Sequence, residues 1–292
     1  MASENISLPV ILAFVSALLW GIWWIPIRYL ESLGMSGAWG SVTMNIGAAA
    51  AALAFVTIRR VPLQISARGV MGATLVGVAV TFYSVAITFS DVVRVVLLFY
   101  LAPAWSKIIE WAFLGQRWGW PSTAAVGLSL LGAYLVLGGD ISLDGIGFGD
   151  VLGVISGMAW AGGAALIFTG GRMNAMSLSL VTAIAATLIG AVFILPGAGD
   201  GLAGLGDWSA KGMGALAGVV YVLPILALTL WSAQRLSPAV ISFLLTAEIL
   251  SGVITGALFL DEPFGVMQAA GAVLILLAAA VEVVPAVMRK PV

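Results

Sequence analysis

The sequence predicts an all-α integral membrane protein with ten transmembrane helices. Of its 292 residues, 62% are hydrophobic and only 9% are charged, whereas a soluble domain is nearer half apolar and a quarter charged. Apolar runs of about 20 residues, the length needed to cross a bilayer, recur along the whole chain. A water-soluble fold with so few charges could not cover its own surface, so the bilayer is the expected solvent.

The ten spans are expected to follow one another with short connections. We expect the first to be retained rather than cleaved, because Met1 to Leu8 contain no Lys or Arg and the apolar run from Pro9 is long enough to span. Pro, Gly and charged residues mark the breaks between spans. The predicted spans lie near residues 9–30, 38–58, 69–89, 92–114, 120–138, 147–169, 176–196, 212–233, 238–260 and 264–287.

The basic residues between the spans predict the orientation. If the N-terminus is cytoplasmic, the inner loops and tail hold eight Lys or Arg residues and the outer side holds three. Cytoplasmic loops normally carry this excess, so we expect both termini in the cytoplasm. The eight are Arg59, Arg60, Arg68, Arg117, Arg172, Arg235, Arg289 and Lys290, and the three are Arg28, Arg94 and Lys211.

The composition excludes several classes of function. The net charge of −1 offers no basic field for nucleic acid. The absence of Cys and His excludes disulfides and Cys- or His-ligated metal sites. There is no Gly-x-x-x-x-Gly-Lys-Ser/Thr loop for a nucleotide, and no His or carboxylate pair suited to a lipid-modifying enzyme. We therefore expect no catalytic residues, no cofactor and no bound metal.

The chain repeats itself. Val15–Gly21 in the first span is similar to Ile155–Ala161 in the sixth, and Phe113–Gly119 after the fourth span is similar to Phe259–Gly265 after the ninth. The offsets are 140 and 146 residues, so five spans match five spans. Because five is odd, the second copy must enter the membrane from the opposite side. The sequence predicts inverted repeats over 1–146 and 147–292, an architecture of carriers that alternate access around a midplane site and one that argues against a purely structural subunit.

Short motifs resemble those of the drug/metabolite transporter superfamily, in its ten-helix EamA-type form. Trp20-Gly21 matches the Trp-Gly element of that family's first span, and Trp160-Ala161 matches it weakly. Pro103 followed by Leu114-Gly115-Gln116 matches its fourth-span pattern, with Gln116 in place of a Glu. The counterpart in the second repeat is Glu248-Ile249 followed by Leu260-Asp261-Glu262-Pro263, with Ile249 in place of a Pro.

The aromatic-rich spans look most like the YddG-type exporters of aromatic and other neutral amino acids. This resemblance implies amino-acid export, with methionine and threonine also as substrates, across a bacterial inner membrane. The expected partners are the amino-acid substrate and membrane lipid; a monomer suffices, and a homodimer stays open. The alternative cargo is other small metabolites or lipophilic cationic drugs.

The third and fourth spans contain candidate substrate-binding residues. Thr81 belongs to a polar stripe formed with Thr74, Gly77, Ser84 and Thr88, and Tyr83 lies beside it. Such a stripe either lines a cavity or makes hydrogen bonds between helices. In the fourth span, Tyr100, Pro103, Lys107 and Glu110 fall roughly on one side, and Pro103 is the expected hinge. Lys107 either neutralises Glu110, meets a substrate carboxylate, or gates the cytoplasmic end.

The ninth span contains Glu248 near mid-depth. A buried carboxylate there needs a partner or becomes neutral. We rank an ion pair with Lys107 first, contact with a substrate ammonium second and proton coupling third. Glu282, near the cytoplasmic end of the last span, is expected either to reach the membrane surface or to contact a loop.

Aromatic residues within the spans are candidates for a substrate-facing wall, although each one singly is more simply explained by packing or lipid contact. They are Trp20, Trp105, Trp160 and Tyr221, and Pro224 near Tyr221 is a second possible hinge. Small residues at every fourth place, from Gly149 to Ala165, predict close packing of the sixth span within the bundle or at a dimer seam.

Overall fold

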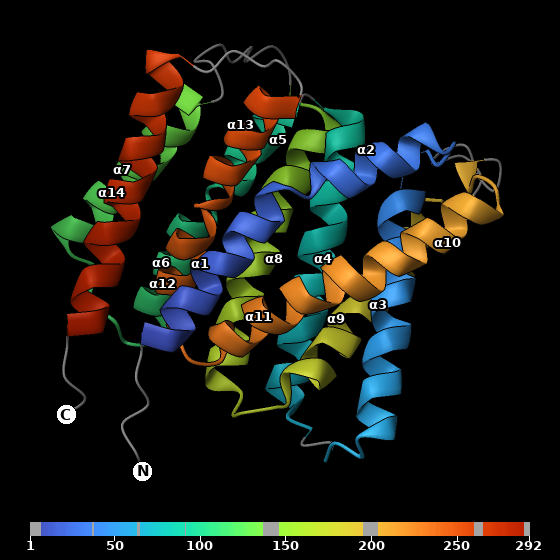
Figure 1. The fold of residues 1–292 in the computed structure, drawn as a ribbon. Helices are drawn as coiled ribbons and strands as arrows, with labels where there is room; N and C mark the ends of the chain where they lie inside the picture. The colour runs from blue at the N-terminus through green and yellow to red at the C-terminus, as the bar shows by residue number, and fades with distance from the viewer. Residues whose placement is uncertain are drawn as a thin grey trace.

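The computed structural model describes residues 7–36, 38–62, 65–90, 92–136, 146–194, 204–259 and 265–288. These residues form one bundle of helices (Figure 1). In chain order the elements are α1 (Ser7–Gly21), α2 (Trp24–Ser32), α3 (Trp39–Ile58), α4 (Ala67–Phe89), α5 (Val92–Phe99), α6 (Ala102–Phe113), α7 (Trp120–Val136), α8 (Phe148–Thr169), α9 (Ala175–Val192), α10 (Trp208–Ala217), the π-helix η2 (Gly218–Val222), α11 (Leu223–Ala233), α12 (Pro238–Leu245), α13 (Glu248–Phe259) and α14 (Val266–Met288).

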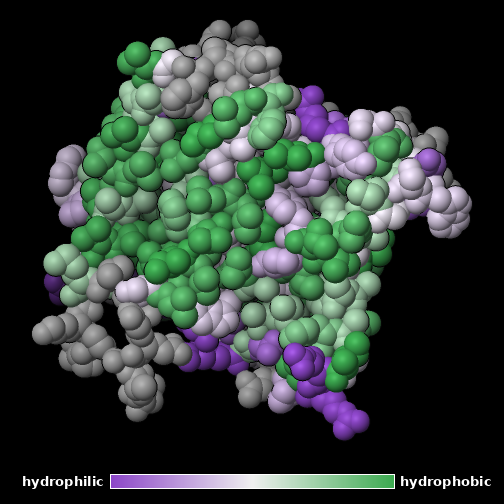
Figure 2. Space-filling model, in the orientation of Figure 1, coloured by the Kyte–Doolittle hydropathy of each residue, from purple (hydrophilic) through white to green (hydrophobic). Residues whose placement is uncertain are grey.

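The ten predicted spans are present. Nine segments of the described chain are long and apolar enough to cross a bilayer. The remaining span is α7, whose 17 residues end where the described residues stop. Apolar residues cover the middle of the molecule and hydrophilic residues gather toward its two ends (Figure 2), as a membrane-spanning protein requires.

The bundle has two ends that the chain visits alternately. α1 begins and α14 ends at the same end, which we call the termini end (Figure 1). The connections α3–α4, α6–α7, α8–α9 and α11–α12 also lie there, whereas α8 begins at the opposite end. Arg172, in the connection after α8, therefore lies at the termini end. Asp144, its expected counterpart on the other side, lies outside the described residues.

The two halves of the chain pack on each other in exchanged pairs. α4 lies along α8, as α11 lies along α1; α5 and α6 pack on α8, as α12 and α13 pack on α1. α3 and α9 pair with each other, and so do α7 and α14. These contacts between the halves recur with the halves exchanged, which is the pattern of two repeats related by a two-fold axis in the membrane plane.

Glycines set two of these seams by the same geometry. A Cβ on Gly72 of α4 would lie 2.7 Å from the carbonyl oxygen of Gly163 on α8. A Cβ on Gly132 of α7 would lie 2.7 Å from the carbonyl oxygen of Gly271 on α14. Both distances are too short for a side chain, so the backbones touch directly. Close backbone approach of this kind gives membrane helices much of their packing energy.

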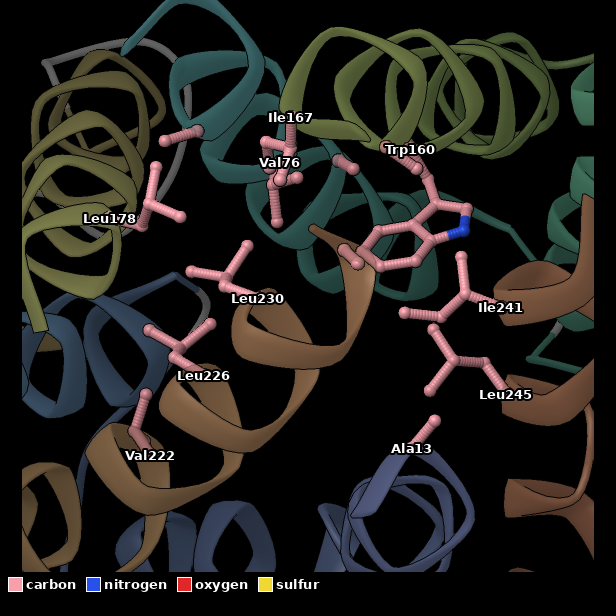
Figure 3. Close-up of a cluster of buried hydrophobic side chains, with 14 of the residues drawn as sticks. Ala13, Val76, Trp160, Ile167, Leu178, Val222, Leu226, Leu230, Ile241 and Leu245 are labelled. Atoms are coloured by element: carbon pink, nitrogen blue, oxygen red, sulfur yellow. The ribbon is translucent and has the colours of Figure 1, made fainter. Parts of the chain in front are cut away.

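The central apolar core lies between α1, α8, α11 and α12. Trp160 of α8 lies against Ile241 and Leu245 of α12, with Ala13 of α1 and Leu230 of α11 around them (Figure 3). α12 is buried along its entire length, from Pro238 to Leu245. It therefore forms the centre of the termini-end half of the bundle rather than part of its surface.

Candidate functional site

The fourth span breaks at Tyr100 and Leu101, between α5 and α6. Pro103 lies in the first turn of α6. Its ring clashes with the carbonyl four residues earlier and it has no N–H to donate, so an α-helix cannot continue through it undisturbed. The freed carbonyl is that of Phe99, and it lies against Gly157 of α8, whose Cβ would be 3.0 Å away. The predicted kink at Pro103 is therefore a real break; motion about it stays a prediction.

The ninth span breaks at Thr246 and Ala247, although no proline causes it. The residue 146 positions after Pro103 is Ile249. Instead, the Ala247 N–H bonds the carbonyl three residues earlier at 3.1 Å, and the Thr246 hydroxyl donates to the Phe243 carbonyl at 2.7 Å. These shorter-range bonds replace those of a regular α-helix. The two breaks are 146 residues apart, as the repeat requires.

The first span breaks at Ile22 and Trp23, directly beside the ninth. Gly21 ends α1, and a Cβ there would overlap both the main-chain carbonyl of Glu248 and the hydroxyl of Ser251. Glycine is thus what allows the end of α1 to touch the start of α13. This contact brings the breaks of the first and ninth spans together.

Glu248, the first residue of α13, lies among three tyrosines. The Tyr100 hydroxyl hydrogen-bonds its carboxyl group. Tyr83 of α4 and Tyr221 of η2 lie close enough to experience its charge. The ion pairs of the described residues do not include Glu248, so its polar neighbours are hydroxyl groups rather than a cation.

Tryptophans extend this group on one side. The ring centroid of Trp23 lies 5.2 Å from that of Trp20 and 6.0 Å from that of Tyr221. Trp20 is fixed by a 3.1 Å bond from its Nε1 to the Thr229 hydroxyl of α11. The Tyr221 hydroxyl donates to the Leu19 carbonyl, close to the end of α1. At the break after α1, the Leu19 carbonyl thus accepts from both the Ile22 N–H and the Tyr221 hydroxyl.

Phe99 extends the group on the other side. Its ring centroid is 5.1 Å from that of Tyr83 and 6.3 Å from that of Tyr100. Six aromatic rings from four spans therefore gather at the helix breaks around one carboxyl group. We call this set the Glu248 cluster: Trp20, Trp23, Tyr83, Phe99, Tyr100, Tyr221 and Glu248.

The expected ion pair between Lys107 and Glu248 is wrong. Lys107 Nζ lies 2.8 Å from Glu282 Oε1 and 3.2 Å from Glu110 Oε2. Glu282 is therefore not a residue that reaches the membrane surface, as its position near the end of the last span suggested: its side chain is 12% exposed and paired. Lys107 lies on the termini-end side of the break in α5–α6, and α14 supplies a carboxylate there.

Thr81 packs between helices. Its hydroxyl donates to the Ala186 carbonyl of α9 at 3.1 Å, and Thr182 of α9 returns a bond to the Ala73 carbonyl at 3.0 Å. Gly77 lies against Thr182 and Ala185. Thr81 and Gly77 of the polar stripe thus form a seam with α9, the packing alternative for this stripe, whereas Thr74 and Ser84 bond carbonyls of their own helix. The neighbouring Tyr83 belongs to the Glu248 cluster.

Two further candidates lie outside the Glu248 cluster. Trp160 is 5% exposed within the apolar core, and its Nε1 donates to the Ser242 hydroxyl at 2.9 Å. Trp105 Nε1 is buried and has no hydrogen-bond partner in the described part of the chain. Pro224 is the second residue of α11, which directly follows η2, so its missing N–H falls where the eighth span makes a π-turn. The small-residue stripe of α8 packs within the bundle, with Gly149 against α4, Gly153 against α5 and Gly157 at the α5–α6 break.

Sequence reasoning missed three features of the site. Trp23 was not singled out as a site residue, because nothing in the sequence predicts the break in the first span that places it beside Trp20 and Tyr221. The break at Thr246 has no proline, and only its distance from the break near Pro103 could have revealed it. The role of Glu282 depends on α14 lying beside α6 and α7, which no local pattern shows.

The chemistry available at the Glu248 cluster is recognition of a positive charge with an apolar body. A carboxylate attracts an ammonium group, and the faces of Trp and Tyr rings attract it as well. Trp20, Tyr83, Tyr221 and Glu248 are each partly exposed, whereas Tyr100 is buried. The rings also offer a large apolar surface, as sites for bulky small molecules do.

Comparison with known proteins identifies the family. The sequence profile of the EamA-like transporter family matches residues 7–138 and again residues 147–283. No curated protein matches the chain significantly. A crystal structure, titled only as that of a protein, shares the fold with a TM-score of 0.73 at 18% sequence identity, over 95% of this chain and 98% of that one. The chain is thus a multi-pass membrane protein that belongs to the EamA-like transporter family.

Proposed function

We propose that this transporter exports small molecules that carry an ammonium group on a bulky apolar or aromatic body, and that neutral amino acids with large side chains are its first candidates. One observation carries the proposal: Glu248 lies among hydroxyl groups and aromatic rings, and its expected partner Lys107 is bound to two other carboxylates. A carboxylate in a membrane span without a cationic partner is a strong candidate for contact with a charged substrate.

An amino-acid cargo also presents a carboxylate. Because Lys107 is occupied, main-chain N–H groups at the start of α6, directly after Tyr100, are the proposed anchor for it. Helix N-termini bind anions through free N–H groups and the helix dipole. Aromatic amino acids fit both halves of this proposal, with methionine and threonine as smaller substrates.

Lipophilic cations are the second candidate. The pairing of Lys107 with Glu110 and Glu282 favours them, because Lys107 is then not free to meet a substrate carboxylate. If Lys107 and the helix start do not contribute a carboxylate contact, an amine without a carboxylate is a better cargo than an amino acid. The Glu248 cluster then acts as an aromatic cage around a cation.

Orientation and location complete the proposal. The connections at the termini end contain Arg59, Arg60, Arg117, Arg172 and Arg235, and Arg68 lies in the first turn of α4 at the same end. By the positive-inside rule this end is cytoplasmic. The proposed location is a bacterial inner membrane, and the proposed boundary between the repeats is residue 146. One chain supplies every residue of the Glu248 cluster, so a monomer suffices for alternating access around it.

Three related compounds test the cargo. Proteoliposomes bearing the purified protein are assayed for uptake of phenylalanine, 2-phenylethylamine and 3-phenylpropionate, which share a ring but differ in charged groups. We expect the two amines to be carried and the carboxylate alone to be excluded. Uptake of phenylalanine without phenylethylamine favours the amino-acid cargo, and the reverse favours cations. Uptake of phenylpropionate alone contradicts the proposal.

A matched pair of variants tests the residue. Glu248→Gln replaces the carboxyl group by an amide and should lower uptake of either amine by at least about tenfold, since hydrogen bonds to charged groups contribute about 1.5–3 kcal/mol. Glu31→Gln, an exposed glutamate at the end of α2, should leave uptake unchanged. Equal uptake by both variants would remove Glu248 from the site.

A further inference from the structure

A buried charge cluster joins four helices at the termini end. Lys107 of α6 pairs with Glu110 of the same helix and Glu282 of α14. Glu282 Oε2 also accepts from the Ser122 hydroxyl of α7 at 3.3 Å, and Glu110 Oε1 accepts from the Ala239 N–H of α12 at 2.9 Å. We call this set the Lys107 latch: Lys107, Glu110, Ser122, Glu282 and the N–H of Ala239.

Burial makes the latch costly to separate. Lys107 is 6% exposed and Glu110 is 2% exposed. Removing one partner from such a group leaves a charge buried without compensation. Glu110 also acts as the cap of α12, because the side chain of Ser237 does not cap it, and a carboxylate at a helix N-terminus is favourable. The latch thus fixes the position of α12 as well as that of α14.

The termini-end half is closed in this structure. All eight residues of α12 are buried, and Ile241 and Leu245 lie against Trp160 and Ala13 in the apolar core (Figure 3). On the termini-end side of the Glu248 cluster, the hydroxyl groups of Ser242 and Ser106 share a hydrogen bond of 2.8 Å. The half that contains the latch is therefore closely packed around α12.

The repeat-equivalent positions of the latch carry no charged residues in the sequence. The residues 146 positions after Lys107 and Glu110 are Val253 and Gly256. The residue 146 positions before Glu282 is Val136. An architecture that is symmetric in its helices is thus asymmetric in its charges, because ionisable side chains occupy these positions in one copy only.

We propose that the Lys107 latch holds the transporter closed at the termini end, and that opening there requires Lys107 to part from Glu282. In the closed state, α6 and α12 are tied to the α7–α14 pair across the path from the Glu248 cluster. Breaking the latch shifts the population toward the state open at the termini end, because a ligand-free two-state equilibrium follows the relative energies of its states. The inference rests on the carrier function proposed above.

Cysteine accessibility tests the proposal without a transport assay. The chain has no cysteine, so Ser242→Cys gives a single reporter in the buried half. A membrane-impermeant thiol reagent is applied from the termini side of oriented vesicles. Labelling should be slow in the Ser242→Cys protein and at least about tenfold faster when Glu282→Gln is added, the change expected when a charge partner is lost. Because cargo plays no part in this readout, failure of the latch and failure of the proposed cargo are distinguishable.

Controls keep the outcome specific. Adding Glu31→Gln to Ser242→Cys should leave labelling slow, because Glu31 is exposed on α2. Ser122→Ala removes one hydrogen bond to Glu282 and should give a smaller rise in the labelling rate. This variant tests the latch if Glu282→Gln does not fold. Unchanged labelling in variants that keep the native elution volume and melting temperature would overturn the proposal. So would an equal rise with Glu31→Gln.

Discussion

Tyr100 and Glu248 join the two broken spans of the repeats at one depth in the bundle. Tyr100 lies at the break between α5 and α6, and Glu248 begins the helix after the break between α12 and α13. The hydroxyl of the first bonds the carboxyl group of the second. The hydrogen bond therefore crosses between the two repeats at the position where each has lost its regular helix.

Removing that hydroxyl should weaken cargo binding without removing the ring. We expect Tyr100→Phe to raise the half-saturating concentration of an amine cargo by about tenfold, because a hydrogen bond to a charged group contributes about 1.5 kcal/mol or more. Uptake into proteoliposomes measures the effect. Tyr29→Phe, at an exposed tyrosine on α2, is the matched control. A Tyr100→Phe protein with wild-type saturation would show that the hydroxyl does not orient Glu248 for binding.

Gly21 should tolerate no side chain. In Gly21→Ala the new Cβ would overlap the Glu248 carbonyl and the Ser251 hydroxyl, and overpacking of this kind costs about 1–3 kcal/mol. Thermal unfolding in detergent should show a lower midpoint than for the wild type. Gly127→Ala is the control, since its Cβ meets nothing within 4 Å on an exposed face of α7. Equal midpoints for the two variants would contradict the contact between α1 and α13.

The sidedness of the bundle can be mapped with single cysteines. Arg117→Cys lies in the exposed connection between α6 and α7, and Ser32→Cys is exposed at the end of α2. In intact cells, an impermeant thiol reagent should label Ser32→Cys and spare Arg117→Cys; in inverted vesicles the pattern should reverse. Labelling of both positions from one side would refute the alternation of the spans, and a reversed pattern would place the termini outside.

Asp207 should give α10 a pH-dependent start. Its Oδ1 accepts from the Ala210 N–H at 2.9 Å and from the Ser209 hydroxyl at 2.8 Å, and these bonds lower the pKa of Asp207 below its usual value of 3.8. A lowered pKa means that the cap is fully formed above the ordinary value and is lost as the pH falls through the lower, folded-state value. Hydrogen exchange at Ala210 should therefore stay slow at neutral pH and rise relative to neighbouring amides in that acid range.

Two substitutions separate the charge from the cap. Asp207→Asn keeps an acceptor and should preserve protection of the Ala210 amide at every pH, because Asn is a good N-cap residue. Asp207→Ala should lose the protection even at neutral pH. If Asp207→Ala retains it, the side chain is not the cap of α10.

The sequence was sufficient for the spans because hydrophobicity and length decide them. All ten helical regions lie near their expected places, and the break beside Pro103 follows from the chemistry of one residue. Tyr83, Tyr100, Tyr221 and Glu248 were singled out separately, as aromatic or ionisable residues within spans. Their grouping around one carboxyl group needed the fold. The repeat boundary at residue 146, the substrates and the orientation stay predictions.

The partners of the charges could not be read from the sequence because they depend on which helices are neighbours. Depth alone allowed Lys107 to reach Glu248, but α14 places Glu282 closer. The hydropathy and depth of Trp160 also suited a residue of a substrate-facing wall. Only the position of α12 reveals that Trp160 packs in the core. Periodicity gives the face of a helix, whereas the identity of the helix opposite that face is a property of the whole chain.

The seam between α7 and α14 has a consequence for biogenesis. α7 packs chiefly on α14, and the glycine contact between Gly132 and Gly271 joins the last helix of each repeat. During synthesis, α7 enters the bilayer long before its partner leaves the ribosome, so its glycine face first lies against lipid. The first half of the chain therefore lacks the packing partner of α7 until α14 inserts. A truncation within α14 would remove this partner from the first half and the last helix from the second.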